Sequence, residues 1–418
     1  MLKKTVCELF AWVGWFRLWL EKLDSWWDTV WANQWEPSTK NSQHAYECYI
    51  HHFCDYDQMN TDIHEVVDYH MNVIPNHSLL VWGFPCQDYS VARTWAKGIQ
   101  WKKWVLWRDI KKILEKKKPE FVLLENVDRL LKSPWNQRGR DFWIILACFD
   151  ELKYDVEWRV INAAEYWCLQ RRRRTFIFWY KRSTKYAKSL KKKSFSEILH
   201  DCWFFFDKFN IKEETKKKLK EPEYDLNKFD KSTRVLDVSN EFKFEFWNAW
   251  IMRDWHIYTE EVIPDYNGPF SYLKDEWVLE YTVDEKYFIT ADKEPKWKAL
   301  KWAKKKKRKE WTPQAYTFSE WAIAYPDPLD RPARTMLTSE WTLNRSTHVV
   351  LDKKTWKKRI LTPLECERIN WFDDNWTDIW TDKRMPERFR YFCMWNALVV
   401  PLITRMWSRL DEIFENED

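Results

Sequence analysis

The chain has 418 residues, which is enough for two domains or for one large domain with insertions. Its formal net charge is +6, and it contains no run of about 18 uncharged apolar residues, so we expect no membrane span. The nine cysteines show neither a CxxC pair nor a disulfide framework, which favours the reducing cytoplasm. The group formed by Cys48, His51, His52 and Cys54 lacks the spacing of common zinc sites, so no metal is expected.

Tryptophan and glycine occur in abnormal numbers. There are 33 tryptophans and only 5 glycines, whereas average usage predicts about 7% glycine, roughly 29 residues in this length. Trp12, Trp15, Trp82, Trp371 and Trp395 stand where a turn would favour a residue that tolerates positive φ. One hypothesis is that a codon meaning glycine was translated as tryptophan, since some bacteria read UGA as glycine and others read it as tryptophan. The alternative is a protein that is truly rich in tryptophan.

The first predicted units alternate strands with loops and helices. Residues 5–10 form a strand, and a loop over residues 11–17 precedes a helical stretch that reaches Lys22. With glycine at positions 12 and 15 this loop would be Gly-rich, and such loops let backbone N–H groups approach a cofactor closely. The second unit ends near Gln34 and Trp35, where a ribose is usually held and an aromatic ring can stack on a base. A third unit reaches Asp62.

Residues 78–81 read as a buried strand that leads into the sequence Gly-Phe-Pro-Cys-Gln-Asp-Tyr-Ser at 83–90. The Pro85–Cys86 pair fixes the backbone beside a thiol at the exit of this strand. Taken alone, Cys86 is either a buried structural cysteine or a nucleophile. The next apolar strand, at residues 121–127, carries Glu125 near its carboxyl end.

Two more strands are expected at residues 156–162 and 175–180, and a helix over residues 105–117. This alternation predicts a doubly wound, mostly parallel α/β sheet, in which ligands bind at the carboxyl ends of the strands. A run of arginines at 171–174 precedes the last of these strands, so Arg172 and Arg174 would face one side. They could converge on an anion or a polarised carbonyl, or belong to a solvated basic turn.

The composition changes after about Lys181. Residues 183–320 are rich in lysine and aromatic residues, with basic runs at 191–193, 216–218 and 304–308. Such runs are often solvated faces, but several of them in one aromatic-rich region suit a phosphate backbone. We therefore predict a catalytic and cofactor-binding domain at 1–182, a target-recognition domain and hinge at 183–390, and a segment at 391–418 that returns to the first domain.

Read in order, these motifs resemble those of the DNA (cytosine-5) methyltransferase family of bacterial restriction-modification systems. The resemblance rests on residues 10–14, 83–87, 125–127, 170–174, 331–335 and 395–397. Trp12 and Trp395 stand where glycine is usual in the family, and Gln34 stands where most members carry a ribose-binding glutamate. An amide can still hydrogen-bond a hydroxyl, so we expect altered cofactor affinity and not its loss.

The resemblance implies the fold of S-adenosylmethionine-dependent methyltransferases, with S-adenosylmethionine as cofactor and a smaller target-recognition domain. It implies these catalytic residues: Cys86, Glu125, Arg172 and Arg174. The implied cofactor-binding residues are Phe10, Trp12, Gly14, Gln34, Trp35, Asp62, Pro85 and Asn396. The implied substrate-binding residues are Gln87, Ser90, Asn126 and Gln170.

The resemblance also implies methyl transfer to carbon 5 of cytosine in a specific sequence of double-stranded DNA, with the base flipped out of the duplex. A cognate restriction endonuclease is a candidate partner, and a cytoplasmic monomer is expected. A tRNA cytosine-5 methyltransferase and a non-catalytic DNA-binding relative are the alternatives. The long basic region favours duplex DNA over RNA, and the joint presence of Cys86, Glu125, Arg172 and Arg174 favours an enzyme.

Overall fold

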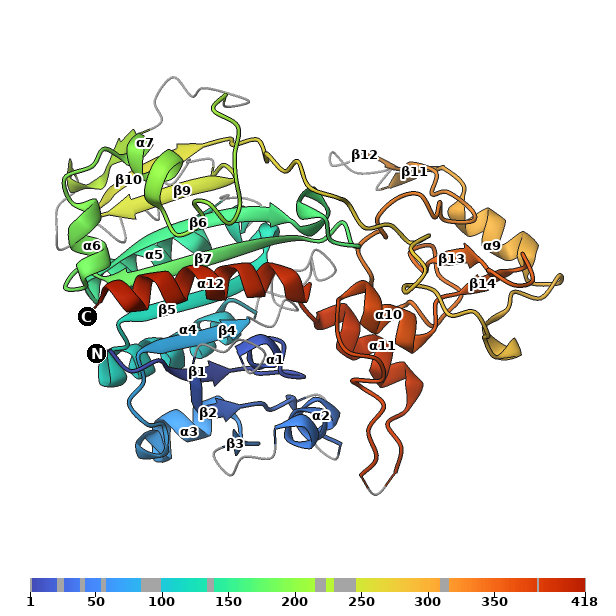
Figure 1. Ribbon diagram of the computed structural model, residues 1–418, viewed down its shortest axis with the longest axis horizontal. Helices are drawn as coiled ribbons and strands as arrows, with labels where there is room; N and C mark the ends of the chain where they lie inside the picture. Colours follow the sequence, from blue (N-terminus) through green and yellow to red (C-terminus); the bar gives the residue numbers. More distant parts are fainter. Residues whose placement is uncertain are drawn as a thin grey trace. The chain divides into compact units, whose positions relative to one another are not determined.

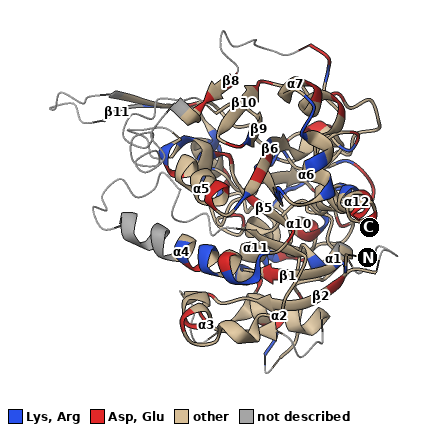
Figure 2. Ribbon diagram, turned by 90° about the vertical axis from the view of Figure 1, so that its left-hand side faces the viewer, with Lys and Arg blue, Asp and Glu red and all other residues tan. Residues whose placement is uncertain are grey.

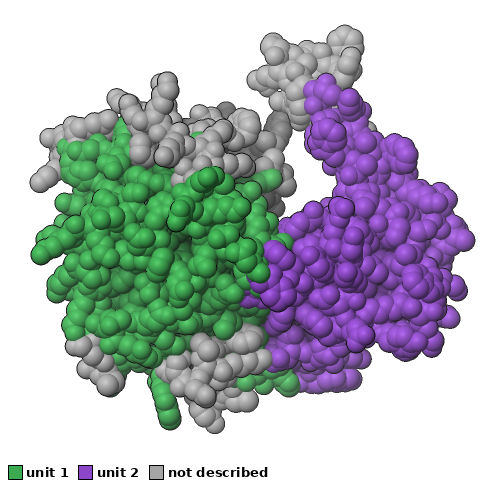
Figure 3. Space-filling view, turned by 45° about the horizontal axis from the view of Figure 1, so that its top comes forward, with its two compact units in different colours: residues 1–166, 173–267, 400–418 green, residues 167–172, 268–399 purple. Residues whose placement is uncertain are grey.

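A computed structural model of the chain describes residues 2–20, 26–37, 42–53, 58–83, 99–133, 139–214, 223–228, 246–308, 316–381 and 383–417. The chain divides into two compact units, which Figure 3 colours separately. Unit 1 comprises residues 1–166, 173–267 and 400–418, and unit 2 comprises residues 167–172 and 268–399. Because compactness does not report function, the assignment of residues 183–390 to target recognition stays a prediction.

Unit 1 is built on a ten-stranded sheet with the order β3-β2-β1-β4-β5-β7-β6-β9-β10-β8 (Figure 1). Its strands are β1 (Thr5–Leu9), β2 (Asp28–Asn33), β3 (Gln58–Met59), β4 (Leu79–Gly83), β5 (Phe121–Val127), β6 (Tyr154–Asn162), β7 (Arg173–Lys181), β8 (Glu223–Asp225), β9 (Ala249–Arg253) and β10 (His256–Glu260). The strands from β3 to β5 pair in parallel, and β7, β6, β9, β10 and β8 continue the sheet in antiparallel pairs. The predicted α/β sheet is therefore confirmed.

Helices cover both faces of this sheet. The helices of unit 1 are α1 (Arg17–Leu20), α2 (His44–His52), α3 (Ile63–Tyr69), α4 (Ile99–Lys117), α5 (Arg140–Glu151), α6 (Lys185–Leu190), α7 (Phe195–Glu197) and α12 (Val400–Asn416). Side chains alternate across a strand, so neighbouring residues of β7 show which helix covers which face. Phe178 stacks on Phe121, whose ring in turn lies 4.9 Å from Phe414 of α12. Trp179 stacks on Phe149 of α5 at 4.0 Å, so α5 lies on the opposite face.

The central strands form where the sequence is apolar without interruption. The first six residues of β5 and all of β4 are buried, as is expected of parallel strands covered on both faces. The predicted strands at 121–127, 156–162 and 175–180 are confirmed within two residues at each end. The strands β9 and β10 were not predicted, because two five-residue strands joined by a short turn produce no βαβ rhythm.

Unit 2 contains shorter elements. They are β11 (Lys304–Arg308), β12 (Tyr316–Glu320), β13 (Val349–Leu351), β14 (Lys358–Ile360), α9 (Glu294–Lys301), α10 (Pro363–Ile369) and α11 (Glu387–Asn396). β11 pairs with β12 and β13 pairs with β14, both in antiparallel fashion.

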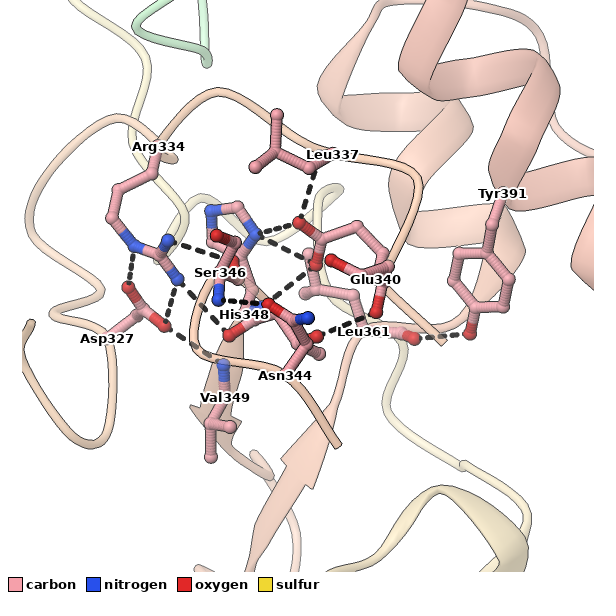
Figure 4. A network of polar contacts seen from close by, with 12 residues as sticks. Asp327, Arg334, Leu337, Glu340, Asn344, Ser346, His348, Val349, Leu361 and Tyr391 are labelled. Atoms are coloured by element: carbon pink, nitrogen blue, oxygen red, sulfur yellow. Dashed lines mark hydrogen bonds and ion pairs between the residues drawn. The ribbon is translucent and has the colours of Figure 1, made fainter. Parts of the chain in front are cut away.

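Buried ion pairs connect these elements. Arg359 of β14 is fully buried and contacts Asp352 at 3.1 Å and Glu365 of α10 at 2.7 Å. A second network lies around Arg334, whose guanidinium binds both carboxylate oxygens of Asp327 at 2.7 and 3.1 Å (Figure 4). Asp327 also accepts a hydrogen bond from the backbone of Val349, so this network ties the predicted 331–335 motif to β13.

The lysine-rich stretches differ in how much of them the structure describes. Residues 191–193 follow α6, residues 304–308 form β11, and residues 216–218 lie outside the described residues. Figure 2 shows that basic residues are mixed with acidic ones along α4. On that helix Lys111 pairs with Glu151 at 3.0 Å and Lys112 with Asp68 at 2.7 Å. Phosphate contact by the lysine-rich stretches stays a prediction. Among the described residues, no helix is long and apolar enough to cross a membrane.

Candidate active site

The site residues of unit 1 gather at one edge of the sheet. Strands β1, β2, β4 and β5 run in parallel, so their carboxyl ends lie together. The order of the sheet reverses between β1 and β4, and such a switch point is where open α/β sheets bind ligands. Leu9 of β1 pairs with Trp82 of β4, and Gly83 of β4 pairs with Glu125 of β5.

Glu125 and Arg174 form an ion pair at this edge. The strands β5 and β7 are antiparallel, which places the end of β5 beside the beginning of β7. Arg174 Nε lies 2.7 Å from Glu125 Oε1, and the two side chains are only 12% and 7% exposed. An ion pair this close, largely shielded from water, restrains the carboxylate by electrostatic attraction.

The other carboxylate oxygen of Glu125 lies toward β4. Glu125 Oε2 is 3.4 Å from the position that a Cβ on Gly83 would take. Gly83 is followed in the sequence by the segment that contains Cys86. The predicted residues Pro85, Cys86, Gln87 and Ser90 lie outside the described residues, and their roles stay predictions.

The loop after β1 turns sharply beside the same edge. Gly14 has φ of +82°, and a Cβ there would lie 2.2 Å from the ring of Phe53, so only glycine fits. Phe10 and Trp12 also have positive φ, at 55° and 54°. Two bulky residues therefore adopt a backbone conformation that side chains strongly disfavour. The prediction of positive φ is confirmed for Trp12 and Trp371, and it is wrong for Trp15, Trp82 and Trp395. Trp82 and Trp395 belong to regular elements, β4 and α11.

Polar side chains lie at the ends of β2 and β3. Gln34 is buried, and its Oε1 accepts a hydrogen bond from the backbone N–H of Trp12 at 2.8 Å. Trp35 follows it and is half-buried. Asp62 caps α3 by accepting a hydrogen bond from the backbone of His64. These groups offer the acceptors and the aromatic face that an adenosyl cofactor needs.

The indole of Trp15 does not fit such a cofactor. It is 95% buried, it stacks on Trp12 with ring centroids 6.5 Å apart, and its Cζ2 lies 3.1 Å from the Cβ position of Gly83. Its Nε1 is buried without a hydrogen-bond partner among the described residues. Buried indoles usually find such a partner. The chain with Trp15 therefore places a large apolar side chain at the ligand-binding edge of the sheet.

Glu8, which the sequence did not single out, is a buried acid in β1. The hydroxyl of Tyr49 donates a hydrogen bond to it at 3.0 Å. Burial raises the pKa of Glu8 to about 8, although Tyr49 and the guanidinium of Arg17 act in the opposite direction. The signal that could have found it is a single charged residue inside an apolar strand.

The remaining predicted residues of unit 1 and unit 2 have structural contacts. Asn126 is fully buried, and its Oδ1 accepts a hydrogen bond from the backbone of Val127 at 2.7 Å. In unit 2, Gln170 donates to Asn370 at 3.3 Å, and Arg172 donates to the carbonyl of Trp395 at 2.8 Å. Asn396 is the last residue of α11, and its side chain bonds to the carbonyl of Phe392.

A family model described as C-5 cytosine-specific DNA methylase matches residues 4–412. The chain belongs to this family. It is a DNA cytosine-5 methyltransferase of the restriction-modification type, which confirms the predicted family and enzyme class.

Relatives of this methyltransferase support the assignment along the whole chain. The chain is 44% identical to the type II methyltransferase M.Sau3AI of Staphylococcus aureus over 99% of its own length and 97% of that protein. It is 30% identical to the type II methyltransferase M.HhaI of Haemophilus parahaemolyticus, over 42% of this chain and 48% of that protein.

Solved structures of methyltransferases share the fold. The Dnmt2 methyltransferase of S. pombe matches with a TM-score of 0.57 over 99% of both chains, at 14% identity. The Entamoeba histolytica methyltransferase EhMeth matches with a TM-score of 0.55 over 100% of both chains, also at 14% identity. At this identity, the likeness concerns the fold alone.

Proposed function

We propose that this methyltransferase transfers a methyl group from S-adenosylmethionine to carbon 5 of cytosine in a specific double-stranded DNA sequence, through a flipped base and a covalent Cys86 adduct. The observation that carries the proposal is the Glu125–Arg174 ion pair of 2.7 Å beside Gly83. Cys86 follows Gly83 by three residues in the sequence, and three residues of chain span at most about 11 Å.

The thiolate of Cys86 is the proposed nucleophile. It adds to carbon 6 of the cytosine ring and forms a sulfur–carbon bond, while the electron pair of the 5,6 double bond becomes available at carbon 5. Without this addition, carbon 5 is a poor nucleophile. Carbon 5 takes the methyl group, its proton is then released to solvent, and departure of the Cys86 sulfur as a thiolate restores the double bond.

Glu125 is the proposed partner of the cytosine N3 and the exocyclic amine. A proton held between its carboxyl and N3 draws electrons toward the ring nitrogen and eases the attack at carbon 6. Arg174 forms an ion pair with Oε1 of Glu125, and Oε2 lies on the side of Gly83. We infer that Oε2 is the oxygen that faces the base.

Arg174 acts in this proposal as a positioning residue for Glu125. Its second proposed role is contact with the O2 carbonyl of the base, where its charge also favours the thiolate. Arg172 is proposed to support the base-binding segment, and its bond to the carbonyl of Trp395 at 2.8 Å is consistent with a structural contribution.

S-adenosylmethionine, when bound, supplies an electrophilic methyl group on a sulfonium centre. Gln34, Trp35 and Asp62 have the chemistry to hold its ribose and adenine. The indole of Trp15 does not fit beside it, for the steric reason given above.

Duplex DNA is the proposed substrate, because the type II methyltransferases it resembles include one that is 44% identical over nearly the whole chain. The target carbon is inaccessible inside a duplex, so flipping of the base is part of the proposal. A cognate endonuclease, a monomeric state and a cytoplasmic location belong to the same proposal. No observation favours the RNA alternative.

The test compares Cys86→Ser with the matched control Cys202→Ser, a half-buried cysteine beyond β7. Both are made in the Trp chain and in a chain with glycine at Trp12 and Trp15, and tritium transfer from labelled S-adenosylmethionine to unmethylated genomic DNA is counted. We expect Cys86→Ser to abolish transfer and Cys202→Ser to leave it unchanged. Transfer by Cys86→Ser, or preferential methylation of RNA by the parent chains, would contradict the proposal.

A further inference from the structure

Tryptophan is strongly over-represented where the backbone is left-handed. Twelve described residues other than glycine have positive φ, and six of them are tryptophans: Trp12, Trp26, Trp167, Trp255, Trp356 and Trp371. We call these six the left-handed tryptophans. Tryptophan supplies 33 of 418 residues, so an even share of the twelve positions would be about one. Among large side chains such a backbone is a true outlier, whereas glycine adopts it freely.

Trp255 occupies a turn that normally demands glycine. Only Asp254 and Trp255 separate β9 from β10, because Arg253 pairs with His256. Both turn residues have positive φ, at 48° and 65°, as a type I′ turn requires. Asp-Gly is among the preferred sequences for this turn, so glycine at position 255 would give an ordinary hairpin.

Trp371 likewise occupies a position that favours glycine, in this case just after the end of a helix. Helix α10 ends at Ile369 with Asn370 as its C-cap. The backbone N–H of Trp371 donates to the carbonyl of Arg368, and that of Phe372 donates to the carbonyl of Glu367. This pair of hydrogen bonds is a Schellman motif, whose left-handed C′ residue is usually glycine.

At Trp26 and Trp356, packing does not select the indole. Trp26 is 92% exposed and precedes β2, and Trp356 is 74% exposed in the loop between β13 and β14. A hydrophobic side chain that stays in water gains little from burial, so neither packing nor conformation favours tryptophan there.

We propose that the six left-handed tryptophans are glycines in the protein that its own cell makes. Their codons are UGA, which some bacteria decode as glycine and others as tryptophan. The inference rests on backbone geometry and on the shortage of glycine, with 5 residues in the chain. It does not depend on the proposed chemistry at Cys86.

Backbone φ and side-chain contacts distinguish the tryptophans that we expect to be genuine from the six left-handed tryptophans. Trp27, directly after Trp26, donates from its indole Nε1 to Asp411 at 2.6 Å and packs on Phe414 with ring centroids 4.7 Å apart. Trp250 is fully buried in β9, and its Nε1 donates to the carbonyl of Trp247 at 2.9 Å. Neither has positive φ. We expect both to be encoded by UGG and to be tryptophan in the cell.

The test is peptide mapping by mass spectrometry of the protein purified from its own cells, read together with its gene. Peptides that cover the six positions should have the mass of glycine, and those that cover positions 27 and 250 the mass of tryptophan. The adjacent pair at 26 and 27 is an internal control, since one peptide reports both. Tryptophan masses at the six positions, or UGG codons there, overturn the proposal. Glycine at Trp27 and Trp250 as well would overturn the geometric criterion.

Discussion

At the scale of single residues, the Glu125–Arg174 pair makes a sharp demand on side-chain type. The guanidinium binds one oxygen of a nearly buried carboxylate. A lysine ammonium is a point charge on a flexible stem, so it cannot reproduce the fixed approach of the planar guanidinium to this carboxylate. The substitution Arg174→Lys therefore tests positioning without changing charge.

We expect Glu125→Gln to lower kcat by about 10²- to 10⁴-fold, because it removes the acid that serves N3. Arg174→Lys should also lower kcat, because the carboxylate of Glu125 would no longer be held in place. The matched control is Arg173→Lys, whose side chain is 59% exposed and lies 3.7 Å from Asp128. Steady-state kinetics with tritiated donor measure the effect. An equal loss in all three variants would indicate disruption of the paired strands β5 and β7 and contradict the assigned roles.

Glu8 should make the stability of the chain depend on pH. Its pKa of about 8 in the folded chain exceeds its ordinary value of 4.5, so the folded state retains a proton that the unfolded chain releases. The resulting stability is fully present below pH 4.5 and is lost as the pH rises to about 8. Glu8→Gln should remove this dependence and be more stable than the parent chain at pH 8, by about 1–3 kcal/mol. Urea unfolding at several pH values measures it, and identical pH profiles would refute the burial argument.

At the scale of elements, buried ion pairs connect β14 to α10 in unit 2. Arg359→Met leaves Asp352 and Glu365 buried without their guanidinium partner. Loss of one partner from a buried pair costs about 3–5 kcal/mol, so we expect a clear fall in the urea midpoint of unit 2. Lys286→Met breaks an exposed pair with Glu387 and should cost less than about 1 kcal/mol. Similar costs for both variants would be incompatible with this account.

The loop after β1 should limit the affinity of the chain for S-adenosylmethionine. In the double variant Trp12→Gly/Trp15→Gly, the change at Trp15 removes an indole from the ligand-binding edge. The change at Trp12 relieves the backbone strain of a tryptophan with positive φ. We expect it to bind S-adenosylmethionine at least about tenfold more tightly, equivalent to roughly 1.4 kcal/mol. Trp27→Gly, which removes an indole that packs on Phe414 of α12, is the control. Isothermal titration gives the affinities, and equal affinity for both chains would rule out the steric block.

The elements also show how far the sequence could be read. Strands β4, β5 and β7 were predictable because each contains an apolar run bounded by polar residues or turns, whereas β6 alternates apolar and polar residues over most of its length. The ion pair between Glu125 and Arg174 was not, because it depends on the antiparallel placement of β7 beside β5. The partners of Arg334 and Arg359 could not be found either, since a buried salt bridge and a solvated charge have the same sequence signature. Trp15, Trp82 and Trp395 lack the positive φ that was expected, because Gly14 takes the left-handed conformation beside Trp15 and the other two lie within β4 and α11.

At the scale of the whole molecule, the six left-handed tryptophans should lower stability together. A left-handed backbone costs a side chain roughly 1–2 kcal/mol, and the greater freedom of glycine in the unfolded chain offsets about 0.4–1 kcal/mol of the gain. Changing all six to glycine should therefore raise the free energy of unfolding by several kcal/mol. Changing Trp27 and Trp250 to glycine should lower it. Denaturant titrations of the purified chains measure both, and destabilisation by the sixfold change would count against the left-handed assignment.

The proposed reaction requires Cys86 to form a covalent bond to a flipped cytosine. DNA that carries 5-fluorocytosine tests it most directly, because the fluorine stands in place of the proton whose loss releases the enzyme. Whichever of the two parent chains, the Trp chain or the chain with glycine at Trp12 and Trp15, transfers methyl groups is incubated with this DNA and S-adenosylmethionine. It is then digested and mapped by mass spectrometry. We expect a stable adduct on the peptide that contains Cys86, and no adduct in Cys86→Ser. Methylation of normal DNA together with no adduct, or an adduct on another residue, would contradict it.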